Sequence, residues 1–323
     1  MIERRLILVI ACAATLAQSA AHAQNYPEKT IRIVSPFTPG GGTDLMGRLI
    51  GQQFTKSWGQ QVIVENRPGA NGMLGSDFVA KAAPDGYTLL VGTMGTHGIN
   101  ASLYRKMPYD AVQDFSPVTA LITSPMLLLV HPSIPARSVS EFIALAKARP
   151  GQITFSSAGT GSVGHLAGEL FNYVAQVKIV HVPYRGSGPA TIDLMSGQVQ
   201  SMMGSPAAAL NYVKAGRVRA LAQTGVKRAA LIPDIPTIAE AGLRDYDVTT
   251  WYGLWGPARM PNAIVQKLHT EVVRMLVLAD IRQQLATQGL EPLGNTPEEF
   301  AALVKAELAK WARVAAHAGI TPE

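Results

Sequence analysis

The pattern of apolar and polar positions at the start of the chain predicts a strand, a tight turn and a helix. A run rich in β-branched residues over 31–34 predicts a strand, which Pro36 ends. Apolar residues then recur at helical spacing over 45–54, so a helix is expected with Thr43 or Asp44 as its N-cap.

The rest of the chain alternates between short apolar runs and longer segments of helical spacing. Strands are expected over 61–66, 87–91, 126–130, 153–156, 178–182, 199–203, 219–223 and 248–254. Helices are expected over 73–83 and 139–149, in segments that end near 175, 196 and 214, and in a last segment that ends near 317. This order predicts two α/β units with a parallel first sheet, joined by crossings near 121–126 and 243–250.

The turn between the first strand and helix contains Pro39-Gly40-Gly41-Gly42. Glycines without a Cβ let the backbone approach a ligand closely. The free N–H groups at the start of a helix favour an anion. An ordinary strand–helix turn that needs glycine only for its geometry remains the alternative.

Gly, Ser and Thr are also concentrated in the loops that follow the other strands, over 92–98, 156–165, 183–188 and 204–206. In open parallel sheets the loops at the carboxyl ends of strands line the ligand crevice. Hydrogen-bond donors dominate these loops and carboxylates are few, which favours a bound carboxylate or other oxyanion. Any single hydroxyl could instead cap a helix or close a turn.

Composition indicates a globular protein with a substantial core. The 323 residues are 47% hydrophobic, 15% charged and 7% aromatic, with a net charge of +6. Basic residues are scattered and aromatic residues are sparse, which argues against a nucleic-acid surface. A mildly positive field would help an anionic small ligand to arrive.

Residues 1–23 have the pattern of a cleavable signal peptide. Arg4 and Arg5 precede an apolar run, and Ala21-His22-Ala23 is an A-x-A site that predicts cleavage after Ala23. The only cysteine, Cys12, lies in this segment, so the mature chain is expected to have neither a disulfide nor a thiolate. Export to a periplasm is therefore expected.

Two catalytic patterns can be weighed in the loop after 153–156. Residues 159–164, GTGSVG, match the G-x-G-x-x-G fingerprint of dinucleotide-binding proteins. Such proteins also have an acidic residue at the end of the next strand, and here that strand ends in Val180-His181-Val182, which argues against a bound dinucleotide. Ser162 lies in a near match to G-x-S-x-G, which leaves an exported serine hydrolase as an alternative. The histidines show no metal-ligand spacing. His97, His165 and His181 lie near strand ends, where they could line a cleft or simply pack.

A long ordered set of motifs resembles the Bug receptors, the extracytoplasmic solute-binding proteins of tripartite tricarboxylate transporters. The resemblance spans essentially the whole mature chain. The residues that carry it are Pro36-Phe37-x-Pro39-Gly40-Gly41-x-x-Asp44, 64–70 (VENRPGA), 82–89 (AAPDGYTL), 107–110 (MPYD), 181–186 (HVPYRG) and 233–237 (PDIPT).

The resemblance implies a periplasmic-binding-protein fold of the second type and no catalysis, metal or cofactor. The two α/β domains would comprise 24–123 plus 248–323, and 124–247. The family holds a carboxylate on the glycine loop, here within 37–42, and the loops at 93–97, 156–161 and 184 should complete the pocket. The expected ligand-binding residues are Phe37, Thr38, Gly40, Gly41, Thr93, Thr96, His97, Ser156, Ser157, Gly159, Thr160, Tyr184, Gly204 and Ser205.

One departure from the family pattern concerns the substrate. Members similar to amino-acid receptors have Asp at the start of the loop after 199–203, where this chain has Gly204. We therefore expect an acid without an amine: a di- or tricarboxylate, or an aromatic carboxylate with Trp251 or Tyr184 as a wall. A monomer that closes on its ligand and passes it to two membrane subunits is expected. A sensor for a membrane kinase would use the same pocket.

Overall fold

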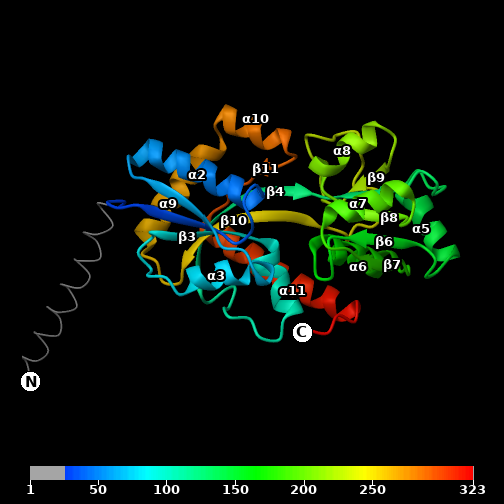
Figure 1. Ribbon diagram of the computed structural model, residues 1–323, viewed down its shortest axis with the longest axis horizontal. Helices are drawn as coiled ribbons and strands as arrows, with labels where there is room; N and C mark the ends of the chain where they lie inside the picture. The colour runs from blue at the N-terminus through cyan, green and yellow to red at the C-terminus, as the bar shows by residue number, and fades with distance from the viewer. Residues whose placement is uncertain (1–25, 323) are drawn as a thin grey trace, which may run out of the picture.

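The computed structural model describes residues 26–322, which form two α/β lobes side by side along the long axis of the molecule (Figure 1). Lobe 1 is built on a six-stranded sheet and lobe 2 on a five-stranded sheet. The expected signal peptide and its cleavage site lie outside the described residues. In the described part, no helix is both long and apolar enough to cross a membrane.

The sheet of lobe 1 has the strand order β11-β4-β10-β3-β1-β2. Its strands are β1 (Ile31–Ser35), β2 (Val62–Asn66), β3 (Thr88–Thr93), β4 (Phe115–Pro125), β10 (Thr249–Pro257) and β11 (Glu291–Pro292). The first three strands are parallel, as the sequence predicts. The complete sheet is mixed, because β10 pairs antiparallel with both β3 and β4.

Helices cover both faces of this sheet and bury two apolar clusters. They are α2 (Gly42–Trp58), η1 (Ala70–Gly72), α3 (Met73–Ala80), η2 (Gly95–Ile99), α4 (Asn100–Leu103), α9 (Asn262–Leu276), α10 (Ala279–Thr287) and α11 (Pro297–His317). Helices α2 and α9 pack together on one face, and α11 packs on η2 on the other. The Thr296 side chain and Glu299 form the capping box that starts α11.

Lobe 2 has the strand order β7-β6-β8-β5-β9. Its strands are β5 (Leu127–Val130), β6 (Thr154–Ser157), β7 (Val180–Pro183), β8 (Ser201–Gly204) and β9 (Arg219–Gln223). Its helices are α5 (Val139–Ala148), α6 (Val163–Ala175), α7 (Ser187–Ser196) and α8 (Pro206–Lys214). Strands β6, β7 and β8 run parallel, so the loops after them emerge at the same edge of the sheet.

The chain crosses between the lobes where β4 leads into β5 and where β9 leads toward β10. Thr224 joins these two crossings. Its N–H donates to Met126 O at 2.9 Å, and its hydroxyl accepts from Met126 N at 2.7 Å. The same hydroxyl donates to Val248 O at 2.5 Å, and Val248 N donates to Thr224 O at 2.9 Å. Because Thr224 is completely buried, water does not compete for these bonds.

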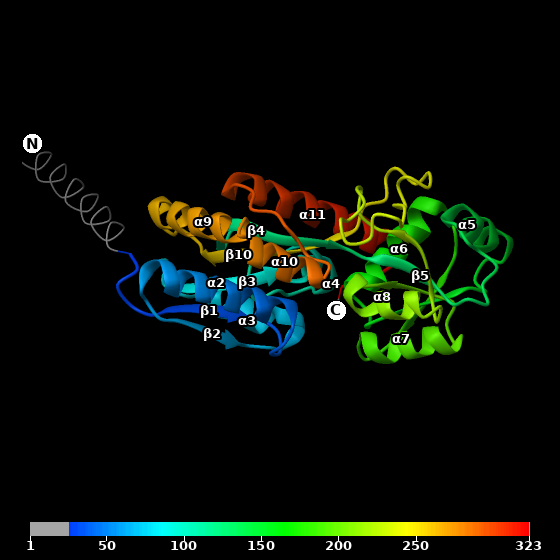
Figure 2. The same ribbon diagram turned by 90° about the horizontal axis from the view of Figure 1, so that it is seen from above.

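Helix α11 makes a further connection between the lobes. It begins on the sheet of lobe 1, and Figure 2 shows that it runs toward lobe 2, where it packs against α6. The lobes are therefore linked by the two strand crossings and by this helix contact.

Candidate functional site

A cavity of about 600 Å³ lies between the two lobes, beside the crossings. This volume is in the range that small-molecule sites occupy. Lobe 1 and the crossing strands contribute Phe37, Gly41, Gly42, Thr43, Thr93, Met94, Gly95, Ser124, Pro125, Thr250, Trp251, Tyr252 and Leu290. Lobe 2 and the segment that enters it contribute Met126, Ala158, Val163, Ser187 and Ser205.

The N-terminus of α2 forms one wall of the cavity. Its N-cap is Gly41, which supplies no side-chain cap, so the expectation of Thr43 or Asp44 as the N-cap is wrong. The Thr43 hydroxyl is instead 2.8 Å from the Ser35 hydroxyl. The first N–H groups of the helix thus lack a side-chain acceptor, and they lie at the cavity, where they favour an anion.

Asp44 fixes the shape of the loop that precedes α2. Its carboxylate accepts from Gly40 N at 3.0 Å and from two nitrogens of Arg48, each at 3.0 Å. These bonds lower the pKa of the Asp44 carboxyl, and the bond with Arg48 has the largest effect. On the other side of the loop, Asn66 donates to Phe37 O at 3.0 Å. The loop is therefore held in place, and Arg48 balances the charge of Asp44.

Helix N-termini from lobe 2 form the opposite wall. Val163 and Ser187 are the first residues of α6 and α7, and Ser205 is the N-cap of α8. Neither α7 nor α8 has a side-chain cap, whereas Ser162 caps α6 by accepting from His165 N. Positive helix ends from both lobes thus surround one cavity, an arrangement that favours a negatively charged ligand.

The side chains around the cavity are neutral. Among the described residues that line it there is no Asp, Glu, Lys or Arg. Hydroxyls come from Thr, Ser and Tyr252, and apolar surface comes from residues such as Met126 and Val163. Trp251 also lines the cavity, and its buried Nε1–H has no hydrogen-bond partner among the described residues. An anion here would be held by neutral donors, with its apolar body against the hydrophobic wall.

Comparison with known proteins identifies the type of protein that has this cavity. The family model "Tripartite tricarboxylate transporter family receptor" matches residues 46–320. The chain belongs to this receptor family. BugT of Bordetella pertussis is 34% identical over 318 residues, which cover 98% of each chain.

Solved structures of similar proteins agree with the family. The structure "R. palustris Rpa4515 with adipate" is 38% identical, with a TM-score of 0.79, over 92% of this chain and 100% of that one. MatC from Rhodopseudomonas palustris, with bound malate, is 37% identical with a TM-score of 0.74, over 90% and 99% of the two chains. The expected α/β periplasmic-binding-protein fold is thereby confirmed, and this receptor family consists of solute-binding proteins rather than enzymes.

The structure brings part of the expected site together at the receptor cavity. Phe37, Gly41, Thr93 and Ser205 line it. Thr38 and Gly40 are exposed on the same loop as Phe37 and Gly41. In lobe 2, Gly159 and Thr160 follow Ala158, which does line the cavity.

Other expected residues make their contacts inside the protein. The Ser156 hydroxyl donates to Ala190 O at 3.3 Å, and the Tyr184 hydroxyl donates to Asp193 at 2.6 Å. A Cβ on Gly204 would lie 2.7 Å from Leu129 Cδ1, so position 204 faces the core of lobe 2. The Ser157 hydroxyl contacts His181 Nε2 at 2.7 Å.

Thr96 and His97 belong to the interior of lobe 1. The Thr96 hydroxyl donates to Thr93 O at 3.0 Å and lies 2.9 Å from His97 Nδ1. His97 is fully buried, and its ring stacks on Trp255 with centroids 4.0 Å apart. Its Nε2 has no partner among the described residues. These contacts place His97 in the aromatic core beneath the receptor cavity.

The hydrolase hypothesis requires a histidine as the base for Ser162, and one histidine further along the chain, His269, is in the other lobe. The Ser162 hydroxyl accepts from His165 N at 3.3 Å as the cap of α6. His269 is on α9 of lobe 1, where its Nε2 lies 3.1 Å from Asn295 O. Ser162 therefore acts as a helix cap, in agreement with the family.

Replacing His97 with phenylalanine should leave carboxylate affinity unchanged and make stability less dependent on pH. Burial lowers the pKa of His97 from 6.5 to about 3. Between these values the unfolded chain binds more protons, so the free energy of unfolding falls by up to about 1.4 kcal/mol per pH unit as pH decreases. Urea denaturation at several pH values measures this slope. An unchanged slope, or lost binding, would contradict the core assignment.

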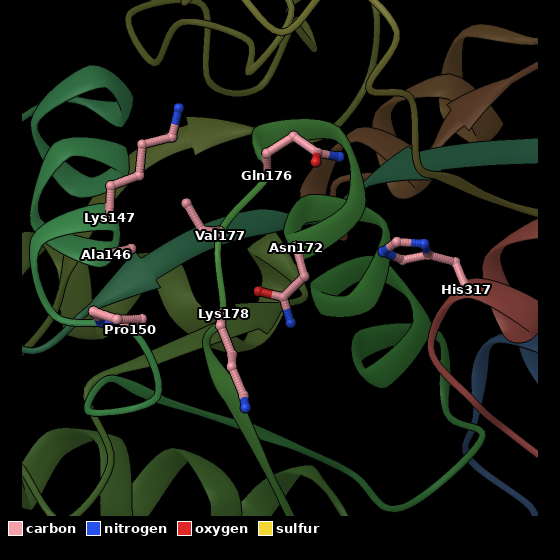
Figure 3. Close-up of a pocket in the computed structure, with 8 residues that line it drawn as sticks. All are labelled: Ala146, Lys147, Pro150, Asn172, Gln176, Val177, Lys178 and His317. Atoms are coloured by element: carbon pink, nitrogen blue, oxygen red, sulfur yellow. The ribbon is translucent and has the colours of Figure 1, made fainter.

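A second hollow, of about 340 Å³, lies in lobe 2 beside the end of α11 (Figure 3). It is lined by the C-terminal ends of α5, α6 and α11. Lys147, Lys178 and His317 are cations or potential cations that complement the negative ends of these helices. The two lysine side chains point in opposite directions in Figure 3, so they do not converge on one ligand.

Proposed function

We propose that this protein is an extracytoplasmic receptor that captures a small carboxylate between its lobes and delivers it to a tripartite tricarboxylate-type membrane transporter. The observation that carries the proposal is the convergence of helix N-termini from both lobes on a cavity whose described lining residues carry no charged side chain. The adipate and malate in similar structures support a carboxylate as the ligand.

The same cavity supports the proposal that the ligand is an acid without an amine. An ammonium group needs an acceptor or a counter-charge when it is buried, and the described lining offers no carboxylate. The apolar surface of Met126, Val163 and Trp251 would contact the hydrocarbon part of a dicarboxylate or an aromatic carboxylate. A tricarboxylate would have to place a third charge against this surface.

We further propose that the lobes act as two domains, 24–123 plus 248–323, and 124–247, which are only partly open without ligand and fully closed with it. The crossings at Met126 and Thr224 would act as the hinge. The chain would reach the periplasm through a signal peptide cut after Ala23, and would work as a monomer with two membrane subunits as its partners.

Thermal unfolding against a panel of acids tests the proposal. The panel contains aliphatic dicarboxylates, citrate, aromatic carboxylates and acidic amino acids. A ligand at about 100 times its Kd stabilises the folded state by about 2.7 kcal/mol, so a true ligand should raise the Tm by several degrees. No shift with any acid would contradict the carboxylate assignment, and a preference for glutamate or aspartate would contradict the absence of an amine.

The variant Tyr252→Phe links a shift in this experiment to the cavity. Tyr252 lies directly against the N-terminus of α2, since a Cβ on Gly42 would be 2.7 Å from its hydroxyl. Loss of one hydrogen bond to a charged group should weaken binding by about 1.5–3 kcal/mol. The melting temperature without ligand serves as the control for folding.

A further inference from the structure

Two histidines lie stacked behind the binding loop of lobe 2, formed by residues 157–161. The rings of His165 on α6 and His181 on β7 have centroids 3.9 Å apart and an interplanar angle of 22°. His165 is only 5% exposed. The family's function gives this pair no role, although the loop in front of it reaches the cavity through Ala158.

Hydrogen bonds connect the pair to the backbone of the loop. Gly161 N donates to His165 Nδ1 at 3.1 Å, so this ring nitrogen must be unprotonated. His181 Nε2 lies 2.7 Å from the Ser157 hydroxyl, which accepts from Gly159 N at 3.1 Å. Both ends of the glycine-containing turn are therefore held by an imidazole, directly at Gly161 and through Ser157 at Gly159.

The loop also contacts the other lobe. A Cβ built on Gly161 would lie 2.5 Å from Leu103 Cδ1, and Leu103 belongs to α4 of lobe 1. The φ of Gly161 is +77°, a conformation that glycine adopts without strain. The position of Gly161 thus decides how closely the lobes approach one another on this side of the cavity.

We propose that His165, stacked on His181, is a positioning residue that holds the binding loop against lobe 1 only while its ring is neutral, so that acid loosens the closed cavity and weakens ligand binding. The part that concerns affinity rests on the proposed function, whereas the part that concerns lobe contact does not.

The two histidines differ in how they respond to a proton. A proton on His165 Nδ1 would face the Gly161 N–H, and two donors cannot share that contact. A proton on His181 Nε2 could still be donated to the Ser157 oxygen, whose own hydrogen can turn to Gly159 O, 3.0 Å away. His165 is therefore the sensitive member of the pair.

The surroundings keep both rings neutral in the closed form. Burial lowers the pKa of His165 to about 4, and burial together with His165 lowers that of His181 to about 4. Glu169, on α6, is 3.9 Å from His165 Nε2, beyond hydrogen-bond distance, and burial raises its own pKa. From α11, His317 acts on Glu169, while β6 contributes the uncharged Phe155 and Ser157. The strand β8 packs on α6 at Gly164, where it presents the backbone of Met203.

The coupling has a definite sign. The closed form excludes a proton that an opened, hydrated His165 would accept near its ordinary pKa of 6.5. Each excluded proton raises the Kd by up to tenfold for every pH unit below that value. We expect the wild-type Kd to rise by about tenfold or more between about pH 7.5 and about pH 5.5.

The test compares His165→Asn with His131→Asn. Asparagine Oδ1 can accept from Gly161 N but cannot be protonated, so the affinity of His165→Asn should change clearly less over this pH range than that of wild type. His131 is a histidine of the same lobe that contacts Ser133, and its variant should keep the wild-type pH profile.

Calorimetry in buffers of different ionisation enthalpy measures whether protons are released on binding. With the acid that gives the largest thermal shift, wild type should release protons in the acidic part of this range and not at neutral pH. Equal pH profiles in wild type and His165→Asn would overturn the proposal.

Small-angle scattering separates this proposal from the proposed function. The radius of gyration of the ligand-free wild type should rise on acidification, and that of His165→Asn should not. If no acid binds at neutral pH, the proposed function fails and scattering alone decides the role of His165. An unchanged wild-type radius overturns that role. If His165→Asn does not fold, His165→Gln replaces it, because glutamine also offers an oxygen acceptor that cannot be protonated, and a full wild-type response in that variant would overturn the proposal.

Discussion

Replacing Gly42 with alanine should weaken carboxylate binding by about a hundredfold, which corresponds to the loss of about one charge-assisted hydrogen bond. The new Cβ would lie 2.4 Å from Tyr252 Cε2 and 2.7 Å from its hydroxyl. The pairing of β10 with β3 and β4 fixes the backbone of Tyr252. Either the ring of Tyr252 or the N-terminus of α2 must therefore shift, and both line the cavity.

Gly51→Ala is the matched control for this experiment. Gly51 is in the same helix but does not line the cavity, and the new Cβ would lie 3.3 Å from Val62 Cγ1. Isothermal calorimetry should find affinity close to wild type for this variant, and circular dichroism should find both variants folded. Equal affinities for Gly42→Ala and wild type would show that the start of α2 does not hold the ligand.

Replacing Trp255 with alanine should lower the free energy of unfolding by about 3–5 kcal/mol. Trp255 is 1% exposed and stacks on His97, and its ring centroid is 4.6 Å from that of Phe300 on α11. The truncated residue would leave a cavity among these rings, in the centre of lobe 1. Urea denaturation followed by circular dichroism measures the loss.

Trp58→Ala provides the comparison for that measurement. Trp58 is the last residue of α2, is only partly buried, and stacks on Phe54 at 4.3 Å. Its removal should cost clearly less, because solvent and neighbouring side chains can fill the space. A loss as large as that of Trp255→Ala would mean that the core does not centre on the His97 stack.

Helices and strands can be predicted from the sequence where the pattern that marks them is local. The bounds of β9 and the C-terminal end of α7 follow from short patterns that the chain carries in place. Strand β4 was missed over most of its length, because 115–120 interleaves Ser, Pro and Thr with apolar residues. Its pairing with β10 joins segments far apart in the sequence, and no local pattern reports such a partner.

The sequence indicates which loops lie at the cavity better than it indicates which side chains of those loops line it. A serine in a glycine-containing loop has the same sequence pattern whether it lines the cavity, as Ser205 does, or bonds inside the lobe, as Ser156 does. Tyr252 and Met126 were missed as lining residues because they come from the crossings and not from strand-end loops. Their strand patterns indicate burial but not the cavity that two lobes create together.

The bonds of Thr224 have a consequence for how the proposed closure of the lobes can be observed. Since one residue fastens both crossings to each other, they cannot bend independently, and opening should follow a single rotational coordinate rather than a mixture of twist and slide. One pair of spectroscopic labels, one on each lobe, should then be enough to track the receptor through its whole cycle. The distance between them should convert directly into an opening angle.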